Sequence, residues 1–291
     1  MDTNEGAFMS EPGTLYIVPT PIGNLSDITE RALTVFKEVD AIAAEDTRHT
    51  RKLLEHYGVQ VPVFAFHDHN EKAKAEQLIE RVINGESIAL VSDAGTPLIS
   101  DPGYALVSLC RKQNVKVTSL PGACALTVAL SGAGLPTDSF QFEGFLPSKP
   151  AQRRAKLESL VNTPRTLVFY ESPHRILHTL EAMADIFEDE RQVVLARELT
   201  KQFETYLTGS AGELITRLNE DPNQQRGEMV LLVEPFQASK DTSGPGEDAK
   251  RTLQILLEEL PLKKAAALSA KLHGERKNEL YQWALSQKNN D

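Results

Sequence analysis

The feature that most constrains this chain is an alternation, in its first half, between short apolar runs and segments of helical length. The apolar runs are LYIV (15–18), AIAA (41–44), SIALV (87–91) and VKVTSL (115–120). Helix-like segments lie near 28–38, 71–83, 104–112 and 124–133. Apolar strands that are separated by helices are typical of a parallel sheet, because each parallel connection needs a crossover. The pattern predicts βαβ units in an α/β lobe over residues 13–141.

A second block of the same kind follows. Its strand-like runs are TLVFY (166–170), VVLAREL (193–199), FETYLTG (203–209) and EMVLLVE (228–234), with helices expected near 174–185 and 211–219. Because 291 residues exceed one average core, two lobes are expected. The segment FEGFLPSKPAQ (142–152) holds one glycine and two prolines, which predicts a linker between the lobes. The second α/β lobe is then expected over 153–236.

The two ends of the chain differ from these lobes in composition. Residues 1–12 read as a disordered tail, and the polar segment 237–248 as a flexible tether. Residues 249–291 predict a helix-turn-helix-like appendage, with helical patterns broken at His273 and Gly274. Between 250 and 291 there are eight basic and five acidic side chains, so the appendage is a candidate RNA-binding element. A solvated helical hairpin explains the same charge pattern equally well.

Composition narrows the class of protein. The chain is 41% hydrophobic and 25% charged, and it has no apolar run long enough to cross a bilayer. Its first ten residues contain no basic side chain, so they do not resemble a secretory signal, and a cytoplasmic protein is expected. Cys110 and Cys124 lie in apolar stretches, which favours buried thiols. The net charge of −10 argues against coating nucleic acid by bulk charge, so any RNA contact must be local.

The stretch IVPTPIGNLSDITERAL (17–33) joins a strand to a helix through an unusually stiff corner. Pro19 and Pro21 have a fixed φ and no N–H, and Gly23 permits the turn that follows. Ser26 or Asp27 is expected to cap the helix. In a parallel sheet this corner lies at the carboxyl end of a strand, where open α/β sheets bind ligands. A rigid βα turn without a ligand is the alternative.

Two further strands end in similar corners. In SDAGTPLISDPG (92–103), Asp93 follows a buried strand directly and is expected to accept hydrogen bonds from a ligand, while Asp101 is expected to cap the next helix. In LPGACAL (120–126) a Pro-Gly pair precedes a helix of small residues, which permits close approach of another helix or of a bound molecule. The three corners together outline a cleft.

These corners, with FYESPHRI (169–176) and GEMVLLVE (227–234), closely resemble the tetrapyrrole-methylase superfamily of S-adenosylmethionine-dependent enzymes. Within it they resemble the 16S rRNA cytidine-2′-O-methyltransferase family, over residues 13–235 and in the helical tail. Pro19 and Pro21 stand where the superfamily has glycines, whereas Gly23 matches its pattern.

The resemblance implies a fold, a reaction and a set of site residues. It implies two α/β lobes with S-adenosyl-L-methionine in the cleft between them, a C-terminal helical appendage and a homodimer. The implied reaction is 2′-O-methylation of a cytidine ribose in 16S rRNA, within the 30S subunit. The implied cofactor-binding residues are Pro21, Asp93, Gly95, Thr96, Cys124, Ala125, Tyr170 and Met229.

Recognition of RNA must come from residues outside the cofactor corners. In EDTRHTRKLLEHYG (45–58) Arg48, Arg51 and Lys52 fall within one helical turn, a spacing that can meet successive phosphates. The alternative is an exposed helix start balanced by neighbouring acids. Further candidate RNA-binding residues are Arg175, Lys201, Lys263, Lys264, Lys271, Arg276 and Lys277. For Arg197 and Glu198, ion pairing between the lobes is an alternative to a role in the site.

A ribose 2′-hydroxyl is weakly acidic, so its methylation benefits from a general base. The candidate bases are Glu171, His67 and His174. His67 and His69 have a spacing that permits metal binding, but no further ligand pattern accompanies them, and no metal requirement is expected.

Two other functions are consistent with the same residues. A small-molecule methylase of the same fold would keep its activity after deletion of residues 241–291. A non-catalytic RNA-binding assembly factor would follow if the prolines at 19 and 21 spoiled the cofactor site, and it would not bind the cofactor.

Overall fold

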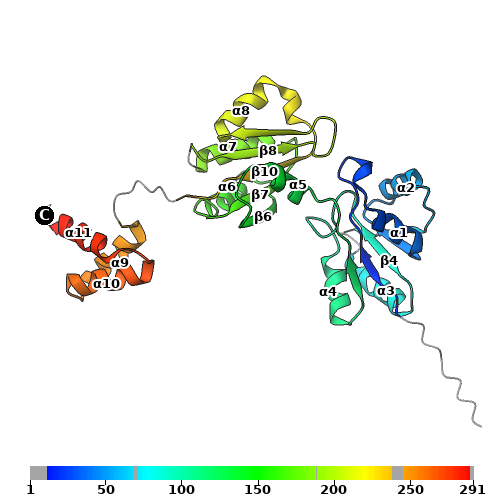
Figure 1. Cartoon of the computed structure of the whole chain (residues 1–291), viewed down its shortest axis with the longest axis horizontal. Helices are drawn as coiled ribbons and strands as arrows, with labels where there is room; N and C mark the ends of the chain where they lie inside the picture. The colour runs from blue at the N-terminus through cyan, green and yellow to red at the C-terminus, as the bar shows by residue number, and fades with distance from the viewer. Residues whose placement is uncertain (1–11, 68–70, 188, 238–244, 289–291) are drawn as a thin grey trace, which may run out of the picture. The chain divides into compact units, whose positions relative to one another are not determined.

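The computed structural model of the 291-residue chain describes residues 12–67, 71–187, 189–237 and 245–288. The chain divides into two compact units between Phe236 and Gln237. The first unit holds two α/β lobes and the second is helical (Figure 1). No described helix is long and apolar enough to cross a membrane.

The first lobe is built on a five-stranded sheet in the order β3-β2-β4-β1-β5, and every strand pair in it is parallel. Its strands are β1 (Leu15–Ile17), β2 (Ala41–Ala44), β3 (Val63–Ala65), β4 (Ile88–Val91) and β5 (Val117–Ser119). From β1 the chain continues to β2, which lies on one side of β1, whereas β5 lies on its other side. The strand order therefore reverses at the carboxyl end of β1. Ligands of open α/β sheets bind at such a point.

Helices cover both faces of this sheet, as its fully apolar strands require. On one face α1 (Glu30–Glu38) and α2 (Thr47–His56) pack through Phe36 and Leu54. On the other face α3 (Glu71–Ile83) and α4 (Tyr104–Lys112) pack through side chains such as Ile79 and Leu106.

The cap of the first helix differs from the sequence prediction. Residues Leu25–Asp27 form a short 3₁₀ turn, η1, that is capped by Asn24, so Ser26 and Asp27 lie inside that turn. The cap of α1 is Thr29, whose hydroxyl accepts a hydrogen bond from Ala32 N at 3.1 Å. Gly103 occupies the N-cap position of α4, two residues after Asp101.

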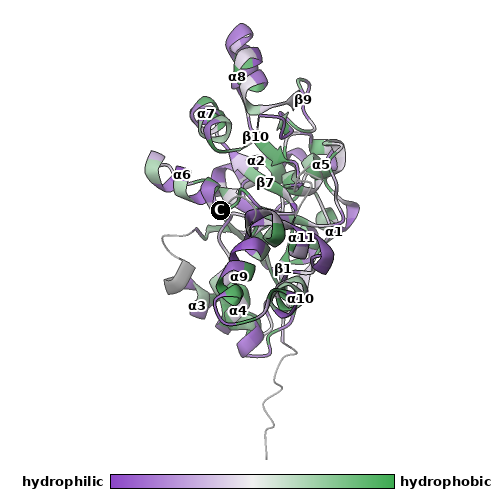
Figure 2. Ribbon diagram, turned by 90° about the vertical axis from the view of Figure 1, so that its left-hand side faces the viewer, coloured by the Kyte–Doolittle hydropathy of each residue, from purple (hydrophilic) through white to green (hydrophobic). Residues whose placement is uncertain are grey.

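The second lobe has a mixed sheet in the order β6-β7-β10-β8-β9. Its strands are β6 (Phe140–Phe145), β7 (Thr166–Glu171), β8 (Val193–Arg197), β9 (Thr205–Gly209) and β10 (Met229–Val233). One face is covered by α6 (Pro150–Glu158), α7 (Ile176–Ile186) and α8 (Ala211–Glu220), with the 3₁₀ turn η2 (Pro222–Gln225) after α8. In Figure 2 the ribbon of α8 carries both green and purple stretches, as expected of a helix with one packed face.

The prediction of a linker at 142–152 is wrong for most of that segment. Residues 142–145 belong to the edge strand β6, which pairs in parallel with β7, and Pro150 is the first residue of α6. Gly144, with φ +64°, lies at a register shift in β6. The glycine thus serves a β-bulge, and proline is well tolerated at a helix start. The glycine and the prolines resemble a linker locally, but the pairing of β6 with β7 makes residues 142–145 part of a strand.

Helix α5 (Ala125–Gly132) joins the two lobes. Its side chains Ala129 and Leu130 pack against the second sheet, on the face opposite α7 and α8. Tyr206 of β9 donates a hydrogen bond to Val128 O at 3.2 Å, and a Cβ placed on Gly132 would lie 2.4 Å from the Tyr206 hydroxyl oxygen. The small residues of this helix therefore allow close approach of the second sheet.

The C-terminal unit consists of three helices around its own small core: α9 (Glu247–Leu257), α10 (Leu262–His273) and α11 (Lys277–Lys288). Leu253 and Leu280 are fully buried there. Ser269 is also buried and donates to Ala249 O at 2.7 Å, which ties α10 to α9. Helix α10 ends at Gly274 in the left-handed conformation, with φ +67°. The sequence patterns predicted α10 and α11 but not α9 as a separate helix.

Candidate functional site

The three strand-ending corners of the first lobe interlock. Thr20 and Gly95 exchange two backbone hydrogen bonds, each 2.9 Å long. Pro19 lies so close to Gly122 that a Cβ on that glycine would be 2.5 Å from the Pro19 Cβ. The Thr96 hydroxyl donates to Ala123 O at 2.9 Å. The stiff prolines of the first corner therefore hold the second and third corners at fixed positions.

A first cavity of about 290 Å³ opens beside these corners. All of the predicted cofactor residues except Pro21 line it, namely Asp93, Gly95, Thr96, Cys124, Ala125, Tyr170 and Met229. Pro21 lines a second, neighbouring cavity instead. Residues that are far apart in the sequence and come from both lobes thus meet at one place, as the cleft prediction required.

The first cavity also has walls that sequence reasoning missed. Glu45 follows strand β2 directly, so its position at a strand end was a usable signal. Phe145 was overlooked because it fell in the expected linker. Ser100 borders the cavity, and its φ is +67°. Leu98, two residues earlier in the chain, has a φ of +74°. Such left-handed non-glycine residues are strained and cannot be read from residue type.

Asp93 is held in place by the neighbouring strand end. Its Oδ1 accepts a hydrogen bond from Asp46 N at 2.9 Å, and its own N–H donates to Glu45 Oε2 at 3.4 Å. Asp46 in turn caps α2 and binds the Arg48 guanidinium, which keeps the pKa of Asp46 below its usual range. The carboxylate of Asp93 is exposed at the cavity and oriented by the loop between β2 and α2.

Tyr170 closes the cavity from the second lobe. Its hydroxyl oxygen accepts a hydrogen bond from Leu126 N at 3.1 Å, and its ring meets Phe142 and Phe145 edge to face. Burial raises the pKa of Tyr170 well above its usual value, so the phenol remains neutral at physiological pH.

The two cysteines differ in surroundings. Cys110 is buried in α4, and burial raises the pKa of its thiol to about 11. Cys124 is only half-buried and lines the first cavity. Neither takes part in a disulfide. The expectation of buried thiols therefore fits Cys110 better than Cys124.

Among the candidate bases, Glu171 lines the first cavity. Its side chain is fully buried and accepts hydrogen bonds from the Thr179 hydroxyl at 2.6 Å and from Ser172 N at 2.8 Å. Arg175 Nε lies 3.3 Å from Glu171 Oε1, and the same guanidinium donates to Pro147 O at 3.4 Å. Arg175 is thus engaged within its own lobe and holds the turn after β6.

The two histidine candidates lie elsewhere. His174 is exposed in the turn between β7 and α7, and His67 is half-buried after β3. Neither borders the two cavities. His69 lies outside the described residues. Within the described part of the chain, no three His, Cys, Asp or Glu side chains gather as a metal site would require.

The second cavity, of about 460 Å³, lies against the first. The two share Ile22, Asp93, Ala94 and Glu228 as a common wall. On its far side, helix α2 contributes His49, Lys52, Leu53 and His56. Of the three basic residues predicted on this helix, Lys52 lines the cavity, whereas Arg48 and Arg51 do not. The Arg48 side chain is 85% exposed and is paired with Asp46.

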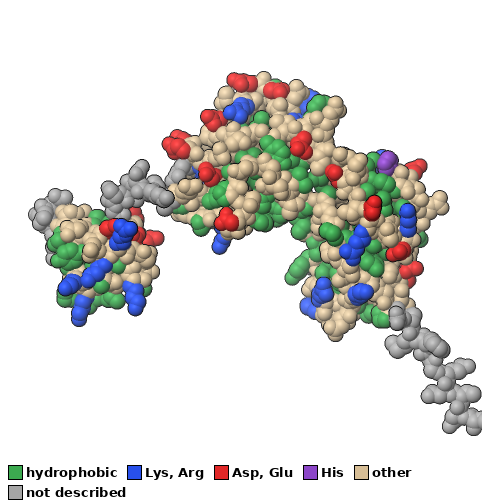
Figure 3. Space-filling view, in the orientation of Figure 1, with side chains coloured by type: hydrophobic (Ala, Val, Ile, Leu, Met, Phe, Trp, Pro, Cys, Tyr) green, Lys and Arg blue, Asp and Glu red, His purple; other side chains and the backbone are tan. Residues whose placement is uncertain are grey.

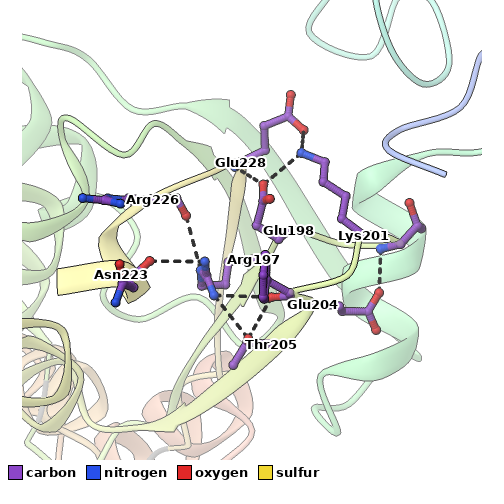
Figure 4. Close-up of polar contacts among 10 residues, drawn as sticks. Arg197, Glu198, Lys201, Glu204, Thr205, Asn223, Arg226 and Glu228 are labelled. Carbon is purple, nitrogen blue, oxygen red and sulfur yellow. Dashed lines mark hydrogen bonds and ion pairs between the residues drawn. The ribbon is translucent and has the colours of Figure 1, made fainter. Parts of the chain in front are cut away.

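Lys201 lies at the border of the second cavity. Its Nζ binds Glu198 Oε1 at 2.9 Å and Glu228 Oε2 at 2.7 Å (Figure 4). Burial opposes its charge, but the hydrogen bonds to Glu228 and Glu198 outweigh burial and raise the pKa of Lys201. Its aliphatic stem covers Gly23 of the first lobe, where a Cβ would lie 2.4 Å from Lys201 Cγ. Lys201 therefore spans from the second lobe to the first corner.

The loop that carries Lys201 is anchored by Arg197. This buried guanidinium donates to Asn223 O at 3.2 Å, to Arg226 O and Phe203 O at 3.3 Å each, and to Gln224 Oε1 at 3.1 Å (Figure 4). Glu198, with φ +51°, pairs with Lys201 of the same loop. Among the described residues, the hydrogen-bond and ion-pair partners of Arg197 and Glu198 all lie in the second lobe, so pairing between the lobes does not explain these two residues.

The predicted RNA-binding side chains of the C-terminal unit are exposed. Figure 3 shows Lys and Arg side chains gathered on the visible face of this unit. The predicted RNA-binding residues there are Lys263, Lys264, Lys271, Arg276 and Lys277. Arg276 lies 3.4 Å from Glu279, in an ion pair within α11 and its preceding turn.

The fold and the first cavity define the class of protein. The family model described as Tetrapyrrole (Corrin/Porphyrin) Methylases matches residues 14–215. The crystal structure of uroporphyrin-III-C-methyltransferase from Thermus thermophilus superimposes with a TM-score of 0.54 at 21% identity, covering 76% of this chain and 94% of that one. Two α/β lobes around a cavity at strand ends are thus the architecture of a methylase.

Relatives of higher identity narrow the class. Ribosomal RNA small subunit methyltransferase I of Vibrio cholerae serotype O1 is 59% identical, over 93% of this chain and 94% of its own. The protein of that name from Escherichia coli O157:H7 is 56% identical, over 94% and 96%. A model described as RsmI C-terminal HTH domain matches residues 243–288. The chain therefore belongs to the tetrapyrrole methylase family, within the group of ribosomal RNA small subunit methyltransferases I. The fold class and the resemblance inferred from the corners are confirmed.

Proposed function

We propose that this protein uses S-adenosyl-L-methionine to methylate the 2′-oxygen of a cytidine ribose in 16S rRNA. The observation that carries the proposal is the common wall of the two cavities, in a chain whose relatives are named for methylation of small-subunit rRNA. A methyl donor in one cavity and an acceptor in the other would meet across that wall. Transfer between two bound groups gains mainly from such alignment.

The residues of the first cavity suit the donor. Its volume of about 290 Å³ is near the lower end for ligand cavities, and its walls combine apolar side chains such as Ile22 and Leu199 with carboxylates such as Asp93. The exposed carboxylate of Asp93 can accept hydrogen bonds from hydroxyl or amine groups, while Gly95 and Ala125 allow close approach of the backbone. When bound, S-adenosyl-L-methionine supplies an electrophilic methyl group on a sulfonium sulfur.

The chain's own residues would align the acceptor and take up its proton. Tyr170, Phe145 and Leu199 cover the first cavity from the second lobe and limit access of water. Because the oxygens of Glu171 are already bound by Thr179, Ser172 and Arg175, we assign it to positioning rather than to proton transfer. One oxygen of Glu228, Oε2, binds Lys201 Nζ at 2.7 Å, but this side chain is 73% exposed and borders both cavities, so it is better situated than Glu171 to accept the hydroxyl proton.

Further parts of the proposal concern partners. We propose that the substrate is rRNA within the 30S subunit, that the protein acts in the cytoplasm and that it forms a homodimer. Its exposed basic side chains on the C-terminal unit would bind phosphates. The clustering of Lys and Arg on that unit, in a chain of net charge −10, supports this assignment.

Labelling of rRNA tests the function. Purified protein is incubated with methyl-labelled S-adenosyl-L-methionine and either free 16S rRNA or 30S subunits from a strain that lacks the gene. We expect label on a single cytidine ribose, located by nuclease digestion and mass spectrometry. Label on a base, or label on neither RNA, would contradict the proposal and favour a small-molecule acceptor or a non-catalytic role.

A further inference from the structure

The second cavity is a feature of the first unit that the methyl donor does not account for. At about 460 Å³ it has the size of a small-ligand site. Its walls come from the first corner, the second corner at residues 92–94, one face of α2, and Lys201 and Glu228 of the second lobe. A ligand in the second cavity would lie next to the wall that the two cavities share.

The face of α2 toward this cavity follows helical periodicity. His49, Lys52 and His56 are three and four residues apart, so they lie along one side of the helix. Thr50 is buried and also lines the cavity, whereas Leu54 packs in the core of the first lobe. The Asp46 cap accepts a hydrogen bond from Arg48 N at 2.8 Å. The helix is thereby fixed with its two imidazoles and one ammonium group directed to the cavity.

The charges of the cavity are unequally compensated. The Lys201 ammonium forms ion pairs with two carboxylates, at 2.9 and 2.7 Å, so its charge is neutralised within the protein. Lys52 is exposed and, within the described residues, has no carboxylate within ion-pair distance. Asp93 and Glu228 give the shared wall a negative charge. The cavity can therefore accept one anionic group at α2, while a ligand with several carboxylates would be repelled at the wall.

We infer that the second cavity binds the acceptor as a single pyrimidine nucleotide turned out of its RNA helix, with Lys52 on its phosphate and His49 and His56 against its base. The inference rests on the proposed function and names the acceptor side of that site. Enzymes that modify a nucleotide commonly extrude it into a pocket, and imidazole rings are among the groups on which unstacked bases of RNA pack. The ribose then lies toward Asp93, Ala94 and Glu228, next to the first cavity.

Binding of a free nucleotide tests which ligand the second cavity takes. The full-length protein, with isotope-labelled histidine, is titrated with cytidine 5′-monophosphate, and the imidazole signals are followed by NMR. We expect saturable shifts at His49 and His56, and none at His178, which is exposed on α7 away from both cavities. Equal shifts at all histidines, or no shift at His49 and His56, would overturn the inference.

Kinetics with the natural substrate test the role of Lys52. Lys52→Met should raise KM for the RNA substrate about tenfold, the effect of one charge-assisted hydrogen bond, with kcat nearly unchanged. Its Kd for S-adenosyl-L-methionine, measured by calorimetry, should equal that of wild type, which also verifies folding. Lys37→Met, an equal loss of charge on α1 outside both cavities, is the matched control.

The outcomes separate this inference from the proposed function. If the wild-type protein methylates the cytidine ribose but Lys52→Met has an unchanged KM, the pocket assignment is wrong and the function stands. If cytidine 5′-monophosphate shifts His49 and His56 but no RNA is methylated at a ribose, the proposed reaction is wrong while the nucleotide site stands.

Discussion

The hydroxyl oxygen of Tyr170, at the end of a second-lobe strand, accepts a hydrogen bond from Leu126 N, in the first turn of a first-lobe helix, at 3.1 Å. The N-cap residue of that helix, Cys124, makes no side-chain cap bond of its own. The first N–H groups of a helix have no partner within it, so an acceptor from outside satisfies one of them. Tyr170 therefore caps α5 across the lobe boundary and closes the first cavity at the same time.

Removal of this hydroxyl should weaken both the junction and the cavity. We expect Tyr170→Phe to lower the free energy of unfolding by about 1 kcal/mol, the usual effect of a lost helix cap, and to weaken S-adenosyl-L-methionine binding several-fold. Urea unfolding and calorimetry measure the two effects. Tyr104→Phe, at a tyrosine that is 76% exposed on α4, is the control and should change neither. Unchanged stability in Tyr170→Phe would show that the bond is replaced by water.

Close contact between the first and third corners should be equally sensitive. In Gly122→Ala the new Cβ would lie 2.5 Å from Pro19 Cβ, so one corner must move. We expect a loss of about 1–3 kcal/mol in the free energy of unfolding, together with weaker cofactor binding. Gly212→Ala in α8, where the nearest atom to a new Cβ is 3.9 Å away, should instead be neutral or slightly stabilising. Cofactor affinity that survives Gly122→Ala would mean that the corners adjust independently of the cavity.

Whether an element could be predicted from the sequence depended on the kind of pattern that marks it. Strands such as 41–44 and 87–91 were predicted because strands buried on both faces are apolar throughout. Asp93 was found because strand ends of a parallel sheet converge. The edge strand β6 was missed because Gly144 serves a bulge that only its pairing with β7 reveals. The spacing of His49, Lys52 and His56 marks the cavity face of α2. The prediction of RNA binding grouped Lys52 instead with Arg48 and Arg51, which lie on the neighbouring face.

Some of the site could not be predicted at all. The contact of Lys201 with Gly23 joins residues from different lobes, and no local pattern marks it. The left-handed conformation of Glu198 and Thr200, at φ +51° and +67°, is imposed by the loop around Arg197. Such residues adopt a conformation that their type disfavours, because surrounding hydrogen bonds determine it.

The Lys201 ion pairs should give the protein a characteristic dependence on pH. Burial raises the pKa of Glu198, but the hydrogen bonds from Lys201 and Glu228 N and the charges of Lys201 and Arg197 together outweigh burial and lower this pKa below 4.5. Glu198 therefore stabilises the fold above pH 4.5, and its contribution is lost as pH falls through the lowered value. The pKa of Lys201 is raised above 10.5, so its contribution is present below pH 10.5 and is lost at higher pH.

Comparison of variants isolates that contribution. We expect Lys201→Met to lower the free energy of unfolding by about 1 kcal/mol at pH 7, because Glu198 loses its partner. Urea unfolding between pH 3 and pH 8 should show this difference shrinking as the pH falls below 4.5. Lys116→Met, at an exposed lysine before β5, is the charge-matched control. A difference that stays constant down to pH 3 would assign the effect to packing of the lysine stem on Gly23.

The role of Glu171 can be decided by a pair of substitutions. If Glu171 positions the turn after β7, Glu171→Gln and Thr179→Val should each lower the free energy of unfolding by about 1–2 kcal/mol, since both disrupt the same buried hydrogen bond. kcat should then fall less than tenfold in both. A loss of about 100-fold or more in kcat for Glu171→Gln alone, with Thr179→Val near wild type, would instead identify Glu171 as the general base.

Exposed basic side chains on the C-terminal unit should govern how salt affects RNA binding. Neutralising phosphates releases bound counterions, so each lost phosphate contact lowers the dependence of log K on log salt concentration by about 0.7 for single-stranded RNA. The full-length triple variant Lys263→Met, Lys264→Met, Lys271→Met should therefore reduce that slope by about 2, with cofactor affinity unchanged. The control removes three exposed lysines of the first lobe, at positions 37, 112 and 116. If both triple variants lower the slope equally, the RNA responds to overall charge, and the helical unit has no specific part in binding it.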